Sequence, residues 1–389
     1  MFSRFFFIVA PFFLVNVSAE QMVHITIGSD AVSSLSENKI NNKIIKSQGD
    51  VTLMSVPESK IEEISHLMHE KFNRCGGFIY HSNLEKAKKA LEPQITYKKI
   101  MDYTIGQEAV VNSFIKKANA TKIYEVISKL SSFKNRYYRS TYGVDSQTWI
   151  KSQWELLVKN RTDARVEFFK HEFSQPSVIL TIQGDKNPED IIILGGHGDS
   201  INHVGGGSGP EKVAPGADDN ASGIAVLTEI IRVIVDENYK PQNTIKIISY
   251  AAEEVGLRGS NEIAERMQNT NSNIVGVMQF DMTNFPGSEG KLFLISDYTN
   301  SNQNAFVGKL IDKYIQIPWE FGKCGYACSD HASWTNSGFI ASFPFEASMR
   351  DYNPDIHTER DTLDKSKDSA SFALNFAKLG IAYLVELDK

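Results

Sequence analysis

The stretch Thr244-Ile-Lys-Ile-Ile-Ser-Tyr-Ala-Ala-Glu-Glu254 decides the fold of this chain. Its β-branched and apolar residues, led in by Pro241 and Asn243, are typical of a strand covered on both faces. The strand would end on two adjacent carboxylates, Glu253 and Glu254, whose side chains point to opposite sides. In open α/β sheets the ligand crevice lies at the carboxyl ends of the strands. A solvated acidic loop is the simpler interpretation of a lone Glu-Glu pair, so the surrounding sequence has to decide.

Segments with strand and helix patterns alternate on both sides of this stretch. In chain order they are helices 109–118, 121–132 and 145–158, strands 177–182 and 191–196, helix 221–235, strand 244–252, helix 257–268, strands 274–281 and 292–296, helix 303–314, strand 340–345 and helix 368–387. Alternation of this length predicts an α/β fold, a three-layer sandwich with a mostly parallel mixed central sheet and helices on both faces. We expect residues 102–389 to form one domain.

The residues before 102 differ in character. Residues 1–19 combine Arg4, an apolar run and a small residue at Ala19, which is typical of a cleaved secretory signal peptide. Residues 20–101 predict a small α+β unit, with helices at 58–73 and 83–91 and strands at 23–27, 51–56 and 77–80. This unit carries no catalytic cluster. We interpret it as a pro-region that is removed after folding, with an ordinary N-terminal domain as the alternative.

Composition limits the classes of function. Among 389 residues, 41% are hydrophobic and 23% charged, which is enough for a globular core. The formal net charge of -6 disfavours general binding to nucleic acid. Beyond the signal peptide, no segment is a candidate for crossing a membrane. We therefore expect a secreted, soluble monomer without a nucleic-acid or membrane partner.

A His or an acid follows several of the predicted strands and loops. His197 and Asp199 end the strand 191–196, Asp219 precedes the helix 221–235, Asp281 ends the strand 274–281, and His357 lies in the loop before the last helix. Each has a simpler explanation when it is taken alone, such as a structural histidine or a helix cap. Their recurrence at the ends of an α/β pattern favours one shared site, because the carboxyl ends of parallel strands meet at one edge.

The residue types favour a pair of zinc ions. Two imidazoles and three carboxylates, with the middle carboxylate shared, give each ion several ligands and leave positions for water. Mixed nitrogen and oxygen ligands suit zinc better than calcium or magnesium. The spare carboxylate of the Glu-Glu pair could accept a proton from the attacking water. The sequence has no Gly-x-Ser-x-Gly elbow, P-loop or His-Glu-x-x-His motif.

Six collinear motifs resemble those of the secreted two-zinc bacterial leucyl aminopeptidases. They are Gly-Gly-His197-Gly-Asp199-Ser, Ala-Pro-Gly-Ala-Asp-Asp219-Asn-Ala-Ser-Gly, Tyr-Ala-Ala-Glu253-Glu254-Val-Gly-Leu-Arg-Gly-Ser, Gln-Phe-Asp281-Met-Thr-Asn, Cys324-Gly-Tyr326-Ala-Cys328-Ser-Asp-His-Ala-Ser-Trp and Asn-Pro-Asp-Ile-His357-Thr. Glutamate carboxypeptidase, the glutaminyl cyclases and the transferrin receptor ectodomain use the same fold. The resemblance covers the chain from about residue 102, and it implies a cleaved pro-segment before it.

The resemblance also implies a role for each matching residue. His197 and Asp281 would hold one Zn²⁺, Glu254 and His357 the other, and Asp219 would bridge the two ions through a cis peptide to Asn220.

Three further residues would serve the chemistry. Glu253 would be the general base for attack of a metal-bound water, Asp199 would orient His197, and Tyr326 would stabilise the oxyanion. The chain departs from the pattern at Gly198, where relatives carry a larger apolar residue.

Cys324 and Cys328 are four residues apart, on either side of Tyr326. In an exported protein a short disulfide is the favoured interpretation. Two free thiols and a further metal site are the alternatives. Cys75 would then be unpaired, within the pro-region.

The expected substrates are the N-termini of peptides or proteins. The side-chain pocket would be apolar, which favours leucine, methionine and phenylalanine over acidic residues. Its predicted lining is Met282, Phe345, Met349, Tyr352 and Ile356, with Ile295 and Phe343 as residues that could equally be core. A protease that processes the pro-region is the other expected partner.

Two other functions fit the fold. A glutaminyl cyclase typically works with a single zinc, and a receptor-type ectodomain has lost its metal ligands. The complete ligand set disfavours both, and a count of bound metal ions distinguishes the first from an aminopeptidase.

Overall fold

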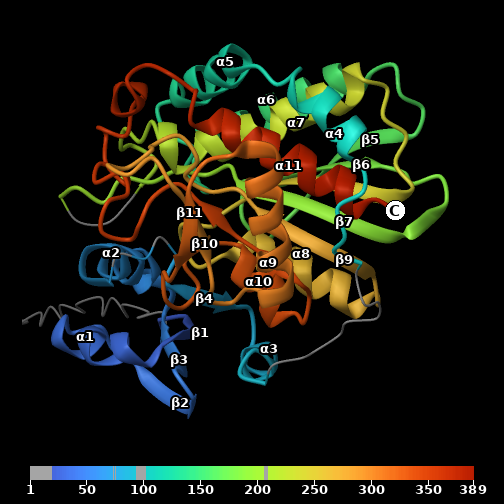
Figure 1. The fold of residues 1–389 in the computed structure, drawn as a ribbon. Coiled ribbons are helices and arrows are strands. Elements are labelled where there is room, and N and C mark those ends of the chain that lie inside the picture. Colours follow the sequence, from blue (N-terminus) through green and yellow to red (C-terminus); the bar gives the residue numbers. More distant parts are fainter. Residues whose placement is uncertain (1–19, 73, 75, 93–101, 206–208) are drawn as a thin grey trace, which may run out of the picture.

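The computed structural model describes residues 20–72, 74, 76–92, 102–205 and 209–389. The predicted signal peptide, residues 1–19, and Cys75 lie outside the described residues. The described chain forms a small N-terminal unit and a larger α/β region that contains every motif quoted above (Figure 1).

The centre of the larger region is a six-stranded sheet in the order β12-β9-β7-β8-β6-β5. Its strands are β5 (Ala164–Phe169), β6 (Ser177–Ile182), β7 (Asn187–His197), β8 (Asn243–Tyr250), β9 (Asn273–Gln279) and β12 (Ala341–Ser342). β12, β9, β7 and β8 pair in parallel, whereas β6 and β5 are antiparallel to their neighbours. This confirms the mostly parallel mixed sheet.

Helices cover both faces of this sheet. In Figure 1, α4 (Glu108–Ile115), α5 (Ala120–Ser131), α6 (Thr141–Val158), α7 (Gly223–Asp236) and α11 (Ala373–Leu387) lie above it, and α8 (Arg258–Asn269) and α10 (His331–Asn336) lie below it. Side chains of β7 alternate between the two cores: Ile192 and Leu194 pack with α7 and α11, and Ile193 packs with α8. Because both faces are buried, the strands read as continuous apolar runs, as expected for a parallel sheet.

A second, three-stranded sheet lies beside the central one. It consists of β10 (Leu292–Ile295), β11 (Trp319–Gly322) and β13 (Pro344–Phe345) in the order β11-β10-β13, and α9 (Ser301–Leu310) follows β10. The single strand predicted at 340–345 is therefore wrong. The chain passes from one sheet to the other within it, since β12 pairs with β9 and β13 pairs with β10.

The last helix begins at Ala373 rather than at residue 368. Lys367 and Asp368 both have positive φ angles, 56° and 50°, which a right-handed helix excludes.

The N-terminal unit is an α+β arrangement, as predicted. Its sheet has the order β2-β3-β1-β4, with β1 (Met22–Gly28), β2 (Lys43–Gln48), β3 (Val51–Pro57) and β4 (Phe78–His81). Its helices are α1 (Val32–Glu37), α2 (Ile61–Phe72) and α3 (Leu84–Lys89). The sequence prediction missed β2 because it is an edge strand, largely exposed and without an apolar period.

The main core of this unit is shared with the α/β region, and a smaller cluster around Leu53, Ala87 and Leu91 belongs to the unit alone. Buried residues of β1, β3 and α2 pack in one cluster with Tyr137, Tyr138, Ile201, Ala252 and Val255 of the α/β region. The last two flank Glu253 and Glu254 in the sequence. The unit therefore sits against the carboxyl ends of the central strands.

Polar contacts add to this interface. Glu58 Oε1 lies 3.0 Å from Arg139 Nη2 and 3.0 Å from Arg258 Nη2. The Gly77 N–H donates to the carbonyl of Ala327 at 2.7 Å. These contacts join the N-terminal unit to three different segments of the α/β region.

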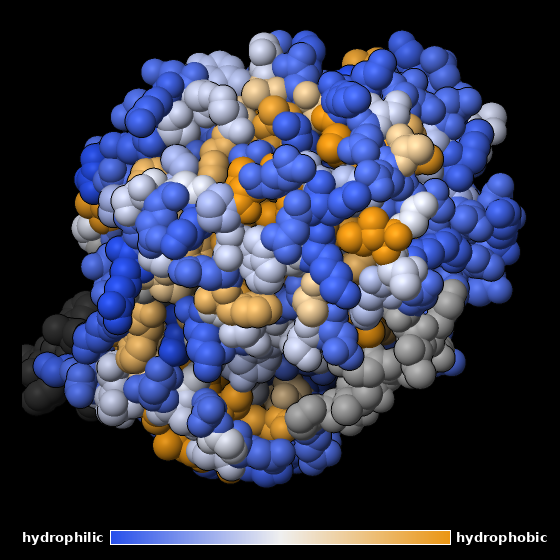
Figure 2. Space-filling model, viewed as in Figure 1, coloured by the Kyte–Doolittle hydropathy of each residue, from blue (hydrophilic) through white to orange (hydrophobic). Residues whose placement is uncertain are grey.

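The face drawn in Figure 2 is mainly hydrophilic, with apolar side chains in small groups. Within the described ranges, no helix combines the length and the apolar character needed to cross a bilayer.

Candidate metal centre

Five potential ligands converge at the carboxyl end of the central sheet. His197 is the last residue of β7, Glu254 follows the end of β8, and Asp281 follows the end of β9. Asp219 lies in the turn that leads into α7, and His357 lies in the loop before α11. Each of the five is at most 3% exposed, so their polar atoms face one another rather than water.

These side chains form two groups that share Asp219. Nε2 of His197 lies 3.0 Å from Asp219 Oδ1 and 3.2 Å from Asp281 Oδ1. Nε2 of His357 lies 3.0 Å from Asp219 Oδ2 and 2.7 Å from Glu254 Oε2. One carboxylate oxygen of Asp219 thus faces each imidazole, which is the arrangement of a bridging ligand.

The donor set fits divalent cations. In each group the three ligand atoms lie within 4.8 Å of one another. Among the described residues, both oxygens of Asp219, both oxygens of Glu254 and Nε2 of His357 have no hydrogen-bond partner. Buried polar atoms without a partner are rare and call for an explanation such as an ion. Nitrogen and oxygen donors without thiolate match the preferences of zinc.

The carboxylates of the two ligand groups favour a bound positive charge, either a proton or a cation. Burial opposes protonation of His197 and His357, but the facing carboxylates of Asp281 and Glu254 outweigh it and raise both imidazole pKa values. Burial, helped by the charge of Asp219, raises the pKa of Glu254 to about 7. A divalent cation would take the place of these protons, because metal binding requires the deprotonated ligands.

Asp199 connects His197 with the Glu-Glu pair. Its carboxylate accepts the backbone N–H of Glu253 at 3.0 Å and of Glu254 at 3.2 Å, and it lies 3.3 Å from Nδ1 of His197. A carboxylate behind a ligating histidine is a common device for fixing the ring.

Glu253 belongs to neither ligand group, whereas Glu254 lies in the group of Asp219 and His357. Both of its carboxylate oxygens are buried and lack a hydrogen-bond partner within the described part of the chain. Burial raises its pKa well above the ordinary value. A buried carboxyl group with free oxygens and a raised pKa is suited to holding a proton near neutral pH.

The side chains of two supporting residues, Asn220 and Ser329, were given no role by the sequence, although both residues stand inside quoted motifs. The peptide from Asp219 to Asn220 is cis, as the resemblance implies, and the Asn220 amide donates to the carbonyl of Phe280 at 3.0 Å. Ser329 donates to Asp281 Oδ2 at 2.6 Å, which leaves Oδ1 facing His197. In the sequence, only their position next to predicted site residues indicated that these side chains support the metal ligands.

Tyr326 makes its hydroxyl contact with the N-terminal unit. The Tyr326 O–H donates to Oγ1 of Thr26 in β1 at 2.7 Å. Oγ1 of Thr26 also lies 2.8 Å from Nε2 of His81 in β4. In this structure the hydroxyl is therefore bound by the N-terminal unit.

The N-terminal unit also covers the metal centre. Ser65 in α2 donates to the carbonyl of Glu254 at 2.6 Å, and the ring of His69 lies 4.4 Å from that of His357 between centroids. At Gly76, a Cβ atom would lie 3.1 Å from Oε1 of Glu253. The N-terminal unit thus lies against both residues of the Glu-Glu pair, at the carboxylate of Glu253 and at the backbone carbonyl of Glu254.

An apolar cavity lies beside Asp281. Of the predicted pocket residues, Met282, Phe345, Met349 and Tyr352 line it, together with Asp281, Phe343, Cys324 and Cys328. Ile356, predicted as a pocket residue, and Ile295 belong to the same apolar cluster but do not line the cavity.

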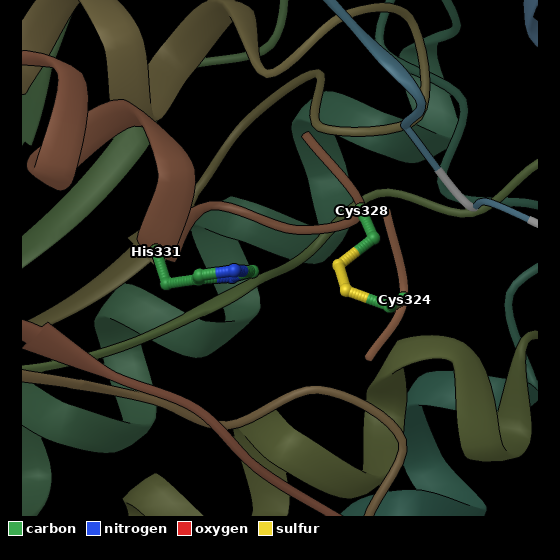
Figure 3. Close-up of side chains that lie close together, drawn as sticks. All are labelled: Cys324, Cys328 and His331. Carbon is green, nitrogen blue, oxygen red and sulfur yellow. A yellow bond between two sulfur atoms is a disulfide. The ribbon is translucent and has the colours of Figure 1, made fainter. Parts of the chain in front are cut away.

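Cys324 and Cys328 form a disulfide, so the favoured interpretation of this pair is confirmed (Figure 3). His331 lies close to both sulfur atoms. Sulfur atoms joined in a disulfide are not thiolates, so the three residues do not offer a metal site in this state. The disulfide closes the loop that carries Tyr326.

The departure at Gly198 has a local cause. A Cβ atom there would lie 2.4 Å from Nε2 of Gln147 in α6 and 2.7 Å from Oγ of Ser249 in β8. The Ser249 hydroxyl donates to Oε1 of Gln147 at 2.9 Å. Gln147 therefore occupies the space that a larger side chain at residue 198 would need.

Comparison with known proteins gives concordant results. The profile of peptidase family M28 matches residues 177–379. A probable leucine aminopeptidase of Arthroderma benhamiae is 34% identical over 81% of this chain and 85% of its own length. A probable aminopeptidase of Saccharomyces cerevisiae is 30% identical over 87% of this chain and 91% of its own length. These curated relatives are fungal.

A solved structure extends the match to the N-terminal unit. The LapA aminopeptidase of Legionella pneumophila superposes with a TM-score of 0.83 at 29% identity, covering 95% of this chain and 99% of its own. A zinc aminopeptidase of Bacillus subtilis, at 15% identity and a TM-score of 0.57, covers 69% of this chain and shares the fold.

Proposed function

This chain belongs to peptidase family M28 and is a metallo-aminopeptidase, a hydrolase of peptide bonds; on this premise we propose that it is a secreted two-zinc enzyme that removes large apolar residues such as leucine from peptide N-termini. The observation that carries the proposal is the position of Asp219, each of whose carboxylate oxygens lies 3.0 Å from a different imidazole. A shared carboxylate between two complete ligand groups suits two cations rather than one.

We assign the ligands accordingly. His197 and Asp281 would hold one zinc ion, Glu254 and His357 would hold the other, and Asp219 would be shared by both. When bound, the two ions supply Lewis-acid activation of the attacking water and of the scissile carbonyl.

The chain itself supplies proton transfer and orientation. An oxygen of the Glu253 carboxylate accepts the proton of the attacking water and then delivers it to the departing amine. Asp199 fixes the His197 ring and, through the two backbone N–H groups, the Glu-Glu pair. Tyr326 donates a hydrogen bond to the oxyanion once its hydroxyl is released from Thr26.

The apolar cavity would receive the side chain of the N-terminal residue. Met282, Phe345 and Met349 offer it no charge and no fixed polar partner, so leucine, methionine or phenylalanine would bury apolar area there. An acidic side chain would lose its hydration without compensation.

Secretion and zymogen processing complete the proposal. The signal-peptide pattern of residues 1–19 supports export, and the cover formed by α2 and Gly76 supports an inactive precursor. A processing protease would cut near the segment 93–101, which joins the two units in the sequence.

Release of the N-terminal unit is therefore expected to activate the enzyme. Cleavage within residues 93–101, followed by removal of residues 20–92, should raise kcat/KM for leucyl-p-nitroanilide by about tenfold or more, because a site that is open only in a minor population binds substrate in proportion to that population. Activity and chain size would be followed together during limited proteolysis. Full activity of the uncut chain would refute the zymogen.

A glutaminyl cyclase remains the second candidate, since two such enzymes share the fold at 17% and 14% identity. Two complete ligand groups favour the aminopeptidase. A receptor-type ectodomain is disfavoured because all five ligands and the base are present.

The function is tested by hydrolysis of leucyl-p-nitroanilide with and without a chelator. We expect activity that a chelator removes and added zinc restores, at about two zinc ions per chain. N-acetyl-leucyl-p-nitroanilide is the matched control, because an exopeptidase needs the free α-amine. Cleavage that resists chelation, or that accepts the acetylated substrate equally well, would contradict the proposal.

A further inference from the structure

The turn that carries Asp219 is held by two buried residues of opposite charge. Residues 215–219 contain the αL glycine Gly216 and end at the shared ligand, Asp219. Arg136 binds carbonyl groups at the start of this turn, and Asp361 binds N–H groups at its end. Neither residue has a role in the mechanism above.

Arg136 joins this turn to the end of β7. Its guanidinium donates to the carbonyl of Gly198 at 3.0 Å, to that of Gly216 at 2.8 Å and to that of Pro215. Gly198 directly follows His197. The guanidinium thus connects the backbone beside one imidazole with the backbone that leads to Asp219.

The approach of Arg136 depends on the glycine of the turn. A Cβ atom on Gly216 would lie 2.7 Å from Nη2 of Arg136 and 2.3 Å from the carbonyl oxygen of Asp219, and φ is +52°. No other residue would allow this conformation and this contact at low cost.

Asp361 makes the complementary contacts on the other side. Its carboxylate accepts the N–H of Asp218 at 3.1 Å and of Asp219 at 3.0 Å, and its own carbonyl accepts the N–H of Ala217 at 3.1 Å. The Asn353 amide donates to Asp361 Oδ1 at 3.1 Å. Both Asn353 and Asp361 lie four residues from His357, so this carboxylate connects the His357 loop with the shared ligand.

The negative charge of Asp361 supports the charge of Arg136 across the turn. Arg136 is fully buried, and its side-chain hydrogen bonds within the described chain all go to backbone carbonyls. Burial lowers its pKa to about 10, and the negative charge of Asp361 is the largest influence that opposes this. A buried charge is tolerated only when it is compensated, so the contacts are maintained against a substantial desolvation cost.

We propose that Arg136 and Asp361 are positioning residues of the metal centre, Arg136 setting Asp219 relative to His197 and Asp361 setting it relative to His357. The inference rests on the two-zinc site proposed above. It predicts that loss of the Arg136 contacts lowers zinc affinity mainly at the His197–Asp219–Asp281 site. Loss of the Asp361 contacts should lower zinc affinity mainly at the Asp219–Glu254–His357 site.

The test measures zinc affinity at each site separately, by competition with a chromophoric chelator and without substrate. Asp281→Ala leaves the His357 site intact, and Glu254→Ala leaves the His197 site intact. In the Asp281→Ala background, Asp361→Asn should weaken zinc binding about 10- to 100-fold, the range typical of residues that orient ligands. In the Glu254→Ala background the effect of Asp361→Asn on zinc affinity should be several times smaller. Arg136→Lys should instead weaken zinc binding more in the Glu254→Ala background than in the Asp281→Ala background.

Matched controls separate positioning from general stability. Asp388 accepts the backbone N–H of Gln242 at 2.9 Å and of Asn243 at 2.6 Å, the same kind of contact at the opposite end of β8. Arg161, which pairs with Asp163, is the corresponding control for the arginine. Asp388→Asn and Arg161→Lys should lower the unfolding temperature of the metal-free protein without changing zinc affinity.

The outcomes are distinct. Equal effects of Asp361→Asn in both backgrounds, or unchanged zinc affinity in a folded variant, would overturn the inference. If Asp361→Asn does not fold, Asn353→Ser removes the amide that fixes Asp361 and carries the same prediction with a smaller effect. A parent chain that binds no zinc at all would refute the two-zinc site itself rather than the separate positioning roles of Arg136 and Asp361.

Discussion

Replacement of Glu253 by glutamine is expected to lower kcat for leucyl-p-nitroanilide about a hundredfold to ten-thousandfold, the usual contribution of a positioned general base. Glutamine has nearly the same shape but cannot accept the proton of the attacking water. The backbone N–H of residue 253 would still donate to Asp199, so the zinc ligands should keep their positions. Steady-state kinetics and metal analysis of the same preparation would show loss of rate at unchanged zinc content.

Glu167→Gln is a suitable control. Glu167 lies on β5, half exposed and paired with Arg165, far in the sheet order from β7 and β9. Its replacement should leave both kcat and zinc content unchanged. A Glu253→Gln enzyme with normal kcat would remove the base assignment, and loss of zinc from it would instead make Glu253 a ligand.

Replacement of Asp219 by alanine should have the second large effect, loss of both zinc ions and of activity. Both of its oxygens face imidazoles, so the variant removes one ligand from each group at once. Glu254→Ala removes a ligand from one group only. Metal analysis after dialysis should therefore give about two ions per chain for the parent, one for Glu254→Ala and none for Asp219→Ala, since a zinc site normally needs at least three protein ligands.

A different series of zinc contents would change the assignment of the ligands. Retention of one tightly bound ion by Asp219→Ala would mean that Asp219 belongs to a single site. Equal loss in both variants would mean that the two ions bind as one unit. The thermal unfolding of the metal-free proteins would show whether either variant is simply misfolded.

Much of this structure follows from local sequence patterns. The apolar runs before His197, Glu253 and Asp281 predict parallel strands, and the common direction of such strands places their carboxyl ends at one edge. This explains why the ligands could be grouped from the sequence. The spacing of Cys324 and Cys328 around Tyr326 similarly predicts a short disulfide.

Other features depend on contacts between distant segments, which periodicity does not encode. Asp361 and Arg136 read as ordinary charged residues until the turn at Asp219 is folded between them. The division of residues 340–345 between two sheets depends on which strands already occupy the neighbouring positions. The hydrogen bond from Tyr326 to Thr26 joins residues 300 positions apart.

The core that the first unit shares with Tyr137, Tyr138 and Val255 has a practical consequence for recombinant production. A gene shortened to begin at codon 102 would encode a polypeptide whose apolar side chains beside the Glu-Glu pair have no covering partner while it leaves the ribosome. Such a product should collect in inclusion bodies. Supplying residues 20–92 from a second plasmid should restore a soluble yield.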